Sequence, residues 1–165
     1  MRGSFGWMEF RAEAKRRFAA KDYFWKHALA RNLEDKRRGL SIHWAIQCFQ
    51  RLMDIRYPER MTEVLPDLHV ARDAFREKPA EGDLGETAME IWYRPNRDAP
   101  QTAMSKLYTA IHEYHANANC IHSSCAVVGN LFCDDWPNGS DWHGESDTYF
   151  AIVLAAHDDV IDRDA

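Results

Sequence analysis

Apolar residues recur along most of the chain at the three- and four-residue spacing of an amphipathic α-helix. The clearest series lies between residues 42 and 56, where the apolar positions are Ile42, Ala45, Ile46, Phe49, Leu52 and Met53. No stretch of the chain alternates apolar and polar residues over the length of a strand while being rich in Val, Ile and Thr. The pattern therefore predicts an all-α protein without a sheet.

Glycine, proline and capping residues divide this helical pattern into separate segments. Helices are expected at residues 8–37 (one helix, or two joined near Lys21-Asp22), 42–56, 66–77, 84–94, 100–114, 121–132 and 148–161. Ser41 is expected to cap the second segment, and Pro66 and Pro100 are each expected near the start of a helix. Short connections between helices favour one domain, residues 1–165, built as an orthogonal helical bundle or a short α-solenoid of about seven helices.

Length and composition fit a folded domain of this kind. The chain has 165 residues, of which 45% are apolar, and a domain of this size buries roughly 70% of its unfolded surface. Residues 1–7 lack the apolar region of a signal peptide and are expected to be a flexible N-terminus or an addition to the natural chain. No apolar run near either end approaches the roughly 20 residues of a membrane span. The four cysteines are expected to be reduced thiols, and the protein to be cytoplasmic.

Charge is distributed unevenly along the chain. Residues 1–60 contain 14 Lys and Arg against 7 Asp and Glu, whereas residues 61–165 contain 7 against 19, for a net charge of −5. Beyond residue 115 Arg163 is the only base. Such asymmetry indicates either an electrostatic partner or two ends of the chain that pack against each other.

The acidic C-terminal region contains the candidate partner-binding residues. Two tryptophans flank a turn sequence at residues 137–140, and Trp is enriched in the energetic centres of interfaces. The candidates are Asp134, Asp135, Trp136, Asp141, Trp142, Asp158 and Asp159. We therefore expect a non-enzymatic protein–protein interaction module that binds a basic partner surface, comparable in class to bacterial immunity proteins, anti-defence inhibitors and secretion accessory factors. The alternative is that both tryptophans fold inward and fix the loop to the bundle.

A nucleic-acid-binding regulator is the first alternative function. Six basic residues of the first third could reach phosphates: Arg11, Lys15, Arg31, Lys36, Arg37 and Arg38. Tyr23 and Trp25 lie close by in the sequence and could stack on bases. Acidic residues interleave with these bases, however, so the segment partly neutralises itself.

A metal-supported helical protein is the second alternative. His112, His115, Cys120, Cys125 and Cys133 offer the imidazole and thiolate ligands that zinc prefers. Their spacing matches no established zinc-binding pattern, so buried thiols and surface histidines are the simpler interpretation and no cofactor is expected. The sequence contains neither of the glycine-rich phosphate-binding motifs, and no residue is predicted to be catalytic.

Overall fold

The computed structural model describes residues 2–132 and 144–164, and the side chains of residues 9–131 and 147–164. This part of the chain contains eight α-helices, one short 3-10 turn (Pro58–Arg60) and no β-strand. The helices are α1 (Arg2–Ala19), α2 (Trp25–Lys36), α3 (Leu40–Arg56), α4 (Met61–Arg76), α5 (Asp83–Trp92), α6 (Ala99–His115), α7 (Ile121–Phe132) and α8 (Gly144–Asp164). The all-α prediction is confirmed. No described helix is both long and apolar enough to cross a membrane.

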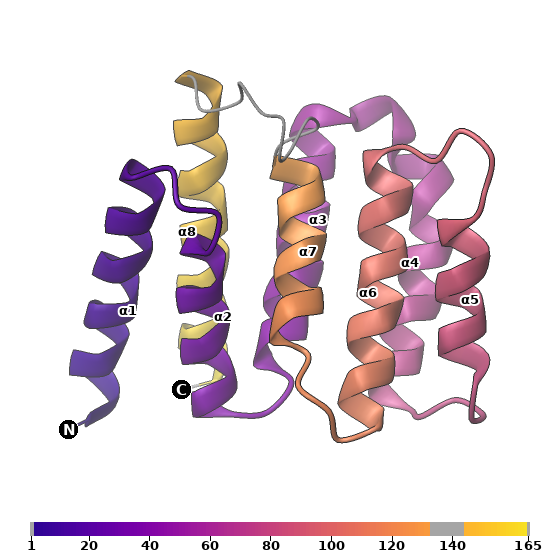
Figure 1. Cartoon of the computed structure of the whole chain (residues 1–165), viewed down its shortest axis with the longest axis horizontal. Coiled ribbons are helices and arrows are strands. Elements are labelled where there is room, and N and C mark those ends of the chain that lie inside the picture. The colour runs from indigo at the N-terminus through magenta and orange to yellow at the C-terminus, as the bar shows by residue number, and fades with distance from the viewer. Residues whose placement is uncertain (1, 133–143, 165) are drawn as a thin grey trace.

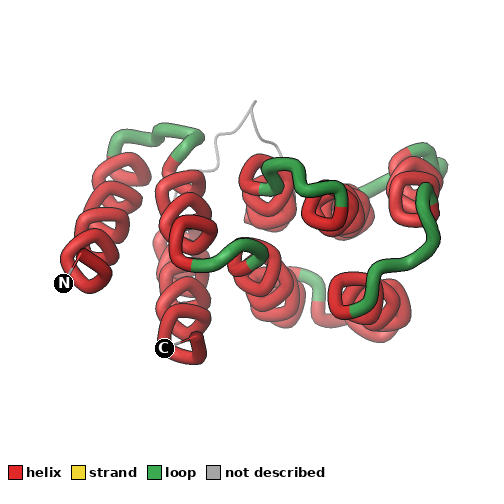
Figure 2. The backbone as a smooth tube through the Cα atoms, turned by 90° about the horizontal axis from the view of Figure 1, so that it is seen from below, coloured by secondary structure: helices red, strands yellow, loops and turns green. Residues whose placement is uncertain are grey.

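The helices stand side by side, with their axes roughly parallel or antiparallel (Figure 1). Seen along these axes they form two rows (Figure 2). One row contains α2, α7, α6 and α5 in that order, and the other contains α8, α3 and α4, while α1 packs against α2 at one end. The helical bundle is thus confirmed, whereas the orthogonal packing that we expected is not.

Helix α3 occupies the centre of the molecule. It contacts α2, α6, α7 and α8, and ten of its 17 residues are buried, as expected for a helix that is apolar on most sides. The indole of Trp44 is fully buried and donates a hydrogen bond to the carbonyl oxygen of Val153 in α8 at 3.2 Å. Helix α3 is therefore joined to α8, its neighbour in the same row, by a polar bond as well as by apolar packing.

The 8–37 segment contains two helices and not one, which confirms the second of the two alternatives expected for it. Helix α1 begins at Arg2, before the expected start at Met8, and a turn around Lys21 separates it from α2. The ring of Phe18 at the end of α1 stacks on Phe150 of α8 with a centroid distance of 4.0 Å. This contact holds the first helix against the last one.

Two helix starts differ from the sequence prediction. Helix α4 begins at Met61, so Pro66 lies inside it; the carbonyl that the proline leaves without a donor belongs to Thr62, which is exposed to water. Helix α3 begins at Leu40, and Ser41 does not cap it. Instead, the carboxylate of Glu34 accepts the backbone N–H groups of Gly39 and Ser41 at 3.0 and 2.9 Å.

Candidate functional site

The candidate partner-binding residues of the acidic region divide into two groups. Asp134, Asp135, Trp136, Asp141 and Trp142 lie outside the described residues. Asp158 and Asp159 lie on α8, where Asp158 forms an ion pair with Arg11 of α1 and Asp159 forms one with Arg51 of α3. Because of these ion pairs, both carboxylates are partly neutralised within the molecule. Their side chains are 23% and 47% exposed.

The basic residues considered for nucleic-acid binding also take part in internal contacts. Arg11 pairs with Asp158, Lys36 donates to the carbonyl of Ile161, Arg37 pairs with Asp164, and Arg38 donates to the carbonyl of Tyr114. Three of these four contacts reach α8, so the basic and acidic ends of the chain do pack against each other. Lys15 and Arg31 are exposed and form no ion pair within the described residues.

The candidate metal ligands lie in different environments. Cys120 is buried near Ser41, whose Oγ is 3.7 Å from its Sγ, and Cys125 is buried too. Burial raises the pKa of the Cys120 thiol to about 11 and that of Cys125 to about 12, which disfavours the thiolate form that binds zinc. Cys133 lies outside the described residues. Within the part of the chain that the structure describes, no three His, Cys, Asp or Glu side chains are grouped to hold a metal ion.

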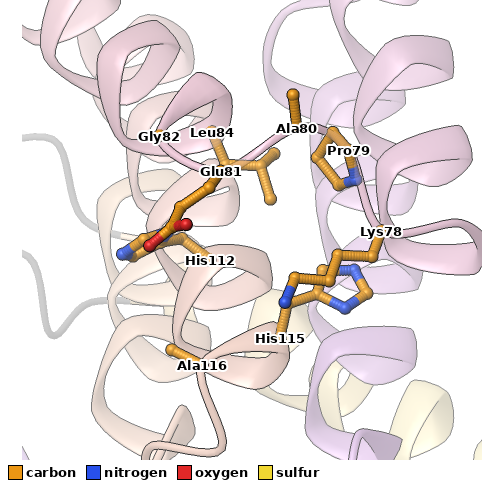
Figure 3. A pocket seen from close by; sticks show the side chains of 9 residues that line it. All are labelled: Lys78, Pro79, Ala80, Glu81, Gly82, Leu84, His112, His115 and Ala116. Atoms are coloured by element: carbon orange, nitrogen blue, oxygen red, sulfur yellow. The ribbon is translucent and has the colours of Figure 1, made fainter.

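His112 and His115 lie together in a pocket of about 210 Å³ between the end of α6 and the α4–α5 connection. Lys78 lies near His115 on one side of this pocket, and Glu81 lies near His112 on the other (Figure 3). The Nε2 of His115 donates to the carbonyl oxygen of Ala74 at 2.6 Å, since a carbonyl can only accept. The pocket thus brings cationic and anionic groups together and can hold a small polar group.

The outward face of α5 is a surface that sequence reasoning missed. Leu84, Ala88 and Ile91 point inward and are buried, while the opposite face exposes Asp83, Glu86, Met89, Glu90 and Tyr93. Met89 is 53% exposed and Tyr93, which follows the helix directly, is 71% exposed. The three carboxylates form no ion pair within the described residues. We refer to these five residues as the α5 face.

A signal for the α5 face was present in the sequence. Once Ala88 and Ile91 are placed inward, the helical period puts Met89 and Tyr93 outward. Trp92 is half-buried beneath the guanidinium of Arg97, which lies 3.7 Å from its ring centroid.

Comparison with known proteins does not assign any of these surfaces. No protein-family model matches the chain, and neither the curated proteins nor the solved structures gave a significant match. The candidate functional surfaces of the described residues are the α5 face, the pocket at His112 and His115, and the remaining exposed residues. Of these surfaces, the α5 face combines Tyr93, the most exposed of the large apolar side chains that the structure describes, with carboxylates that form no ion pair among the described residues.

Proposed function

We propose that this protein is a non-enzymatic protein–protein interaction module of the immunity, inhibitor or accessory type, which acts in the cytoplasm and binds a basic surface on its partner. The observation that carries this proposal is the α5 face. Large apolar side chains are normally withdrawn from water, and an exposed group of them rimmed by charge is typical of an interaction site. Tyr93 and Met89 supply that apolar area, and Asp83, Glu86 and Glu90 supply the charge.

The position of α5 supports the same proposal. Among the described helices α5 packs mainly against α6, and it ends one of the two rows (Figure 1). A partner can therefore approach α5 without displacing another helix. Two copies of this chain facing each other through α5 would bring like charges together, which is unfavourable. A basic partner is favoured for that reason.

The acidic C-terminal region remains part of the proposal with a narrower role. Arg11 and Arg51 already neutralise Asp158 and Asp159, so these two carboxylates are weaker candidates for contact with a partner than the α5 face. Trp136 and Trp142, with the acids beside them, are supported by sequence alone. We keep them as a second candidate contact region.

The experiment begins with affinity capture and mass spectrometry to identify the partner, followed by measurement of its affinity for variants of the α5 face. Replacing Met89 and Tyr93 together by Ser removes the apolar area, and we expect at least tenfold weaker binding. Replacing Glu86 and Glu90 together by Lys reverses the charge, and we expect slower association that depends on salt.

Matched control variants lie on α4. Val70 is 56% exposed and apolar, so Val70→Ser removes a comparable side chain elsewhere, and Asp73→Lys reverses an exposed charge there. These controls are expected to bind the partner as the unchanged protein does. If the captured partner binds both α5 variants with unchanged affinity, the α5 face is not the binding surface.

A further inference from the structure

Four aromatic rings lie next to one another where the α1–α2 turn meets the first turn of α7. Phe24 is 51% exposed, and its ring centroid lies 5.3 Å from that of Tyr23 and 4.9 Å from that of His27. Nε2 of His27 lies 3.4 Å from Nδ1 of His122, a residue 95 positions further along the chain. We call Tyr23, Phe24, His27 and His122 the ring cluster.

Positive groups surround the ring cluster. Arg31 is four residues after His27 and therefore on the same side of α2, and Arg17 donates to the carbonyl oxygen of Phe24 at 3.5 Å. Burial, with added repulsion from Lys26, His122, Arg31 and Arg17, lowers the pKa of His27 to about 4. One carboxylate also lies at the cluster: that of Asp22 accepts the backbone N–H of Phe24 at 2.9 Å.

Stability alone does not explain this arrangement. Arg17 forms an ion pair with Glu13 at 2.8 Å, whereas Arg31 forms none within the described residues. Nδ1 of His27 is buried and has no hydrogen-bond partner in the described part of the molecule, which costs free energy in a folded protein. Arg31, a cation without an ion pair in the described residues, together with an exposed aromatic ring suits the binding of an anion that carries a flat ring.

We propose that the ring cluster and Arg31 bind a nucleotide unit, with its base stacked on Phe24 and its phosphate held by Arg31 and His122. Every nucleobase has a flat face that can stack on an aromatic side chain, and each carries its phosphate nearby. The unit can come from a free nucleotide or from a single strand. Because the whole chain has a net charge of −5, binding depends on this local surface and not on general attraction to polyanions.

The ring cluster is separate from the α5 face. Helices α1 and α2 lie at one end of the molecule, and α5 lies at the other (Figure 1). The two sites can therefore be occupied at the same time, and each can be tested without disturbing the other.

Fluorescence anisotropy of the full chain with a labelled oligothymidylate of about 12 nucleotides tests the proposal. Phe24→Ala is expected to weaken binding by about tenfold. Arg31→Gln is expected to weaken binding and to reduce the slope of log affinity against log salt concentration by about 1, the amount for one phosphate contact. Val70→Ala and Arg76→Gln are matched controls because both residues are exposed and lie on α4, away from the ring cluster. Circular dichroism confirms that each variant is folded.

Competition by thymidine monophosphate distinguishes the two sources of the nucleotide unit. Displacement of the labelled strand by the monophosphate indicates a free nucleotide as ligand, whereas displacement only by an unlabelled strand indicates single-stranded nucleic acid. The proposal is overturned if neither probe binds at low salt. It is also overturned if Arg76→Gln weakens binding as much as Arg31→Gln, because attraction would then be general.

Discussion

The ring of Tyr114 lies directly against the backbone of Gly39, so that a Cβ atom at Gly39 would be 2.9 Å from Cε2 of the tyrosine. Gly39 has a φ of +93°, in the left-handed region that side chains rarely adopt. The turn between α2 and α3 therefore requires glycine for two separate reasons, and the end of α6 is fitted against it.

Replacing Gly39 by Ala is expected to lower the free energy of unfolding by about 2 kcal/mol, from backbone strain together with overlap with Tyr114. Gly82 provides a matched control because its φ is +92° and no atom lies within 4 Å of a Cβ placed there. Gly82→Ala should therefore show the backbone contribution alone, about 1 kcal/mol. Urea denaturation measures both, and equal losses would show that contact with Tyr114 contributes nothing.

Glu34 serves as the cap of α3 from the preceding helix, and its removal leaves the amides of Gly39 and Ser41 without an acceptor. We expect Glu34→Ala to destabilise the fold by about 1 kcal/mol, in the range of lost helix caps. Asp35→Ala removes an exposed neighbouring carboxylate and should have almost no effect. Thermal unfolding of the two variants provides the comparison, and a similar loss for both would contradict the capping role.

The ion pair between Arg11 and Asp158 joins α1 to α8. Because the two side chains are only 33% and 23% exposed, Asp158→Asn is expected to cost about 1 kcal/mol, at the upper end for partly exposed pairs. Asp162→Asn, at an exposed position on the same helix without an ion pair in the described residues, is the control. Chemical denaturation at low and high salt should show a difference between the variants that shrinks as salt is added.

Three of the histidines that the structure describes have a lowered pKa, each chiefly because of burial. Burial lowers the pKa of His27 to about 4, and it also lowers those of His43 and His157. In the unfolded chain a histidine takes up its proton near pH 6.5, so between that pH and about 4 the unfolded state binds more protons at His27 than the folded state. The free energy of unfolding must then fall as the pH decreases through this window. Melting temperatures at neutral pH and near pH 5 should show the fall.

His27→Gln is expected to reduce this loss of stability at low pH, since the residue no longer titrates. His69, which is exposed, is the control position, and His69→Gln should leave the pH dependence unchanged. If the unchanged protein and both variants show the same pH dependence, groups other than His27 are responsible for the loss of stability at low pH.

Replacing Trp136 and Trp142 by Ala tests the second candidate contact region of the proposed interaction. If the tryptophans contact the partner, its binding should weaken at least tenfold while the melting temperature is maintained. If they instead pack inward, the melting temperature falls. Unchanged binding by a folded double variant would remove this region from the proposal.

Local pattern was sufficient to predict most helices and several of their ends. The expected start before Pro100 is confirmed, because Asp98 and Gln101 form a capping box. The predicted start of this helix at Pro66 is wrong: α4 begins at Met61, and Met61, Val64, Leu65 and Leu68 continue the helical period through the proline. The pattern of apolar residues does not show whether the free energy gained by burying them exceeds the cost of the one backbone hydrogen bond that the proline cannot form.

The candidate sites were harder to predict because they depend on contacts between distant segments. The pair of Arg11 and Asp158 joins positions 147 apart, and the charge asymmetry allowed either such pairing or an external partner. The ring cluster likewise exists only because α2 lies beside α7. His112 and His115 line one pocket, whereas Cys120 lies against Glu34 of α2, a contact that spacing along the sequence does not show.

Because α5 packs mainly against α6, the hydrogen bonds of α5 can open without unfolding the central helix α3. Its amides should exchange with deuterium faster than those of α3, at a free energy below that of global unfolding. A bound partner would cover the exposed face of α5 and should slow that exchange. Protection of α5 amides would then report occupancy of this end of the molecule, and proteases should cleave the unbound protein within α5 more readily than within α3.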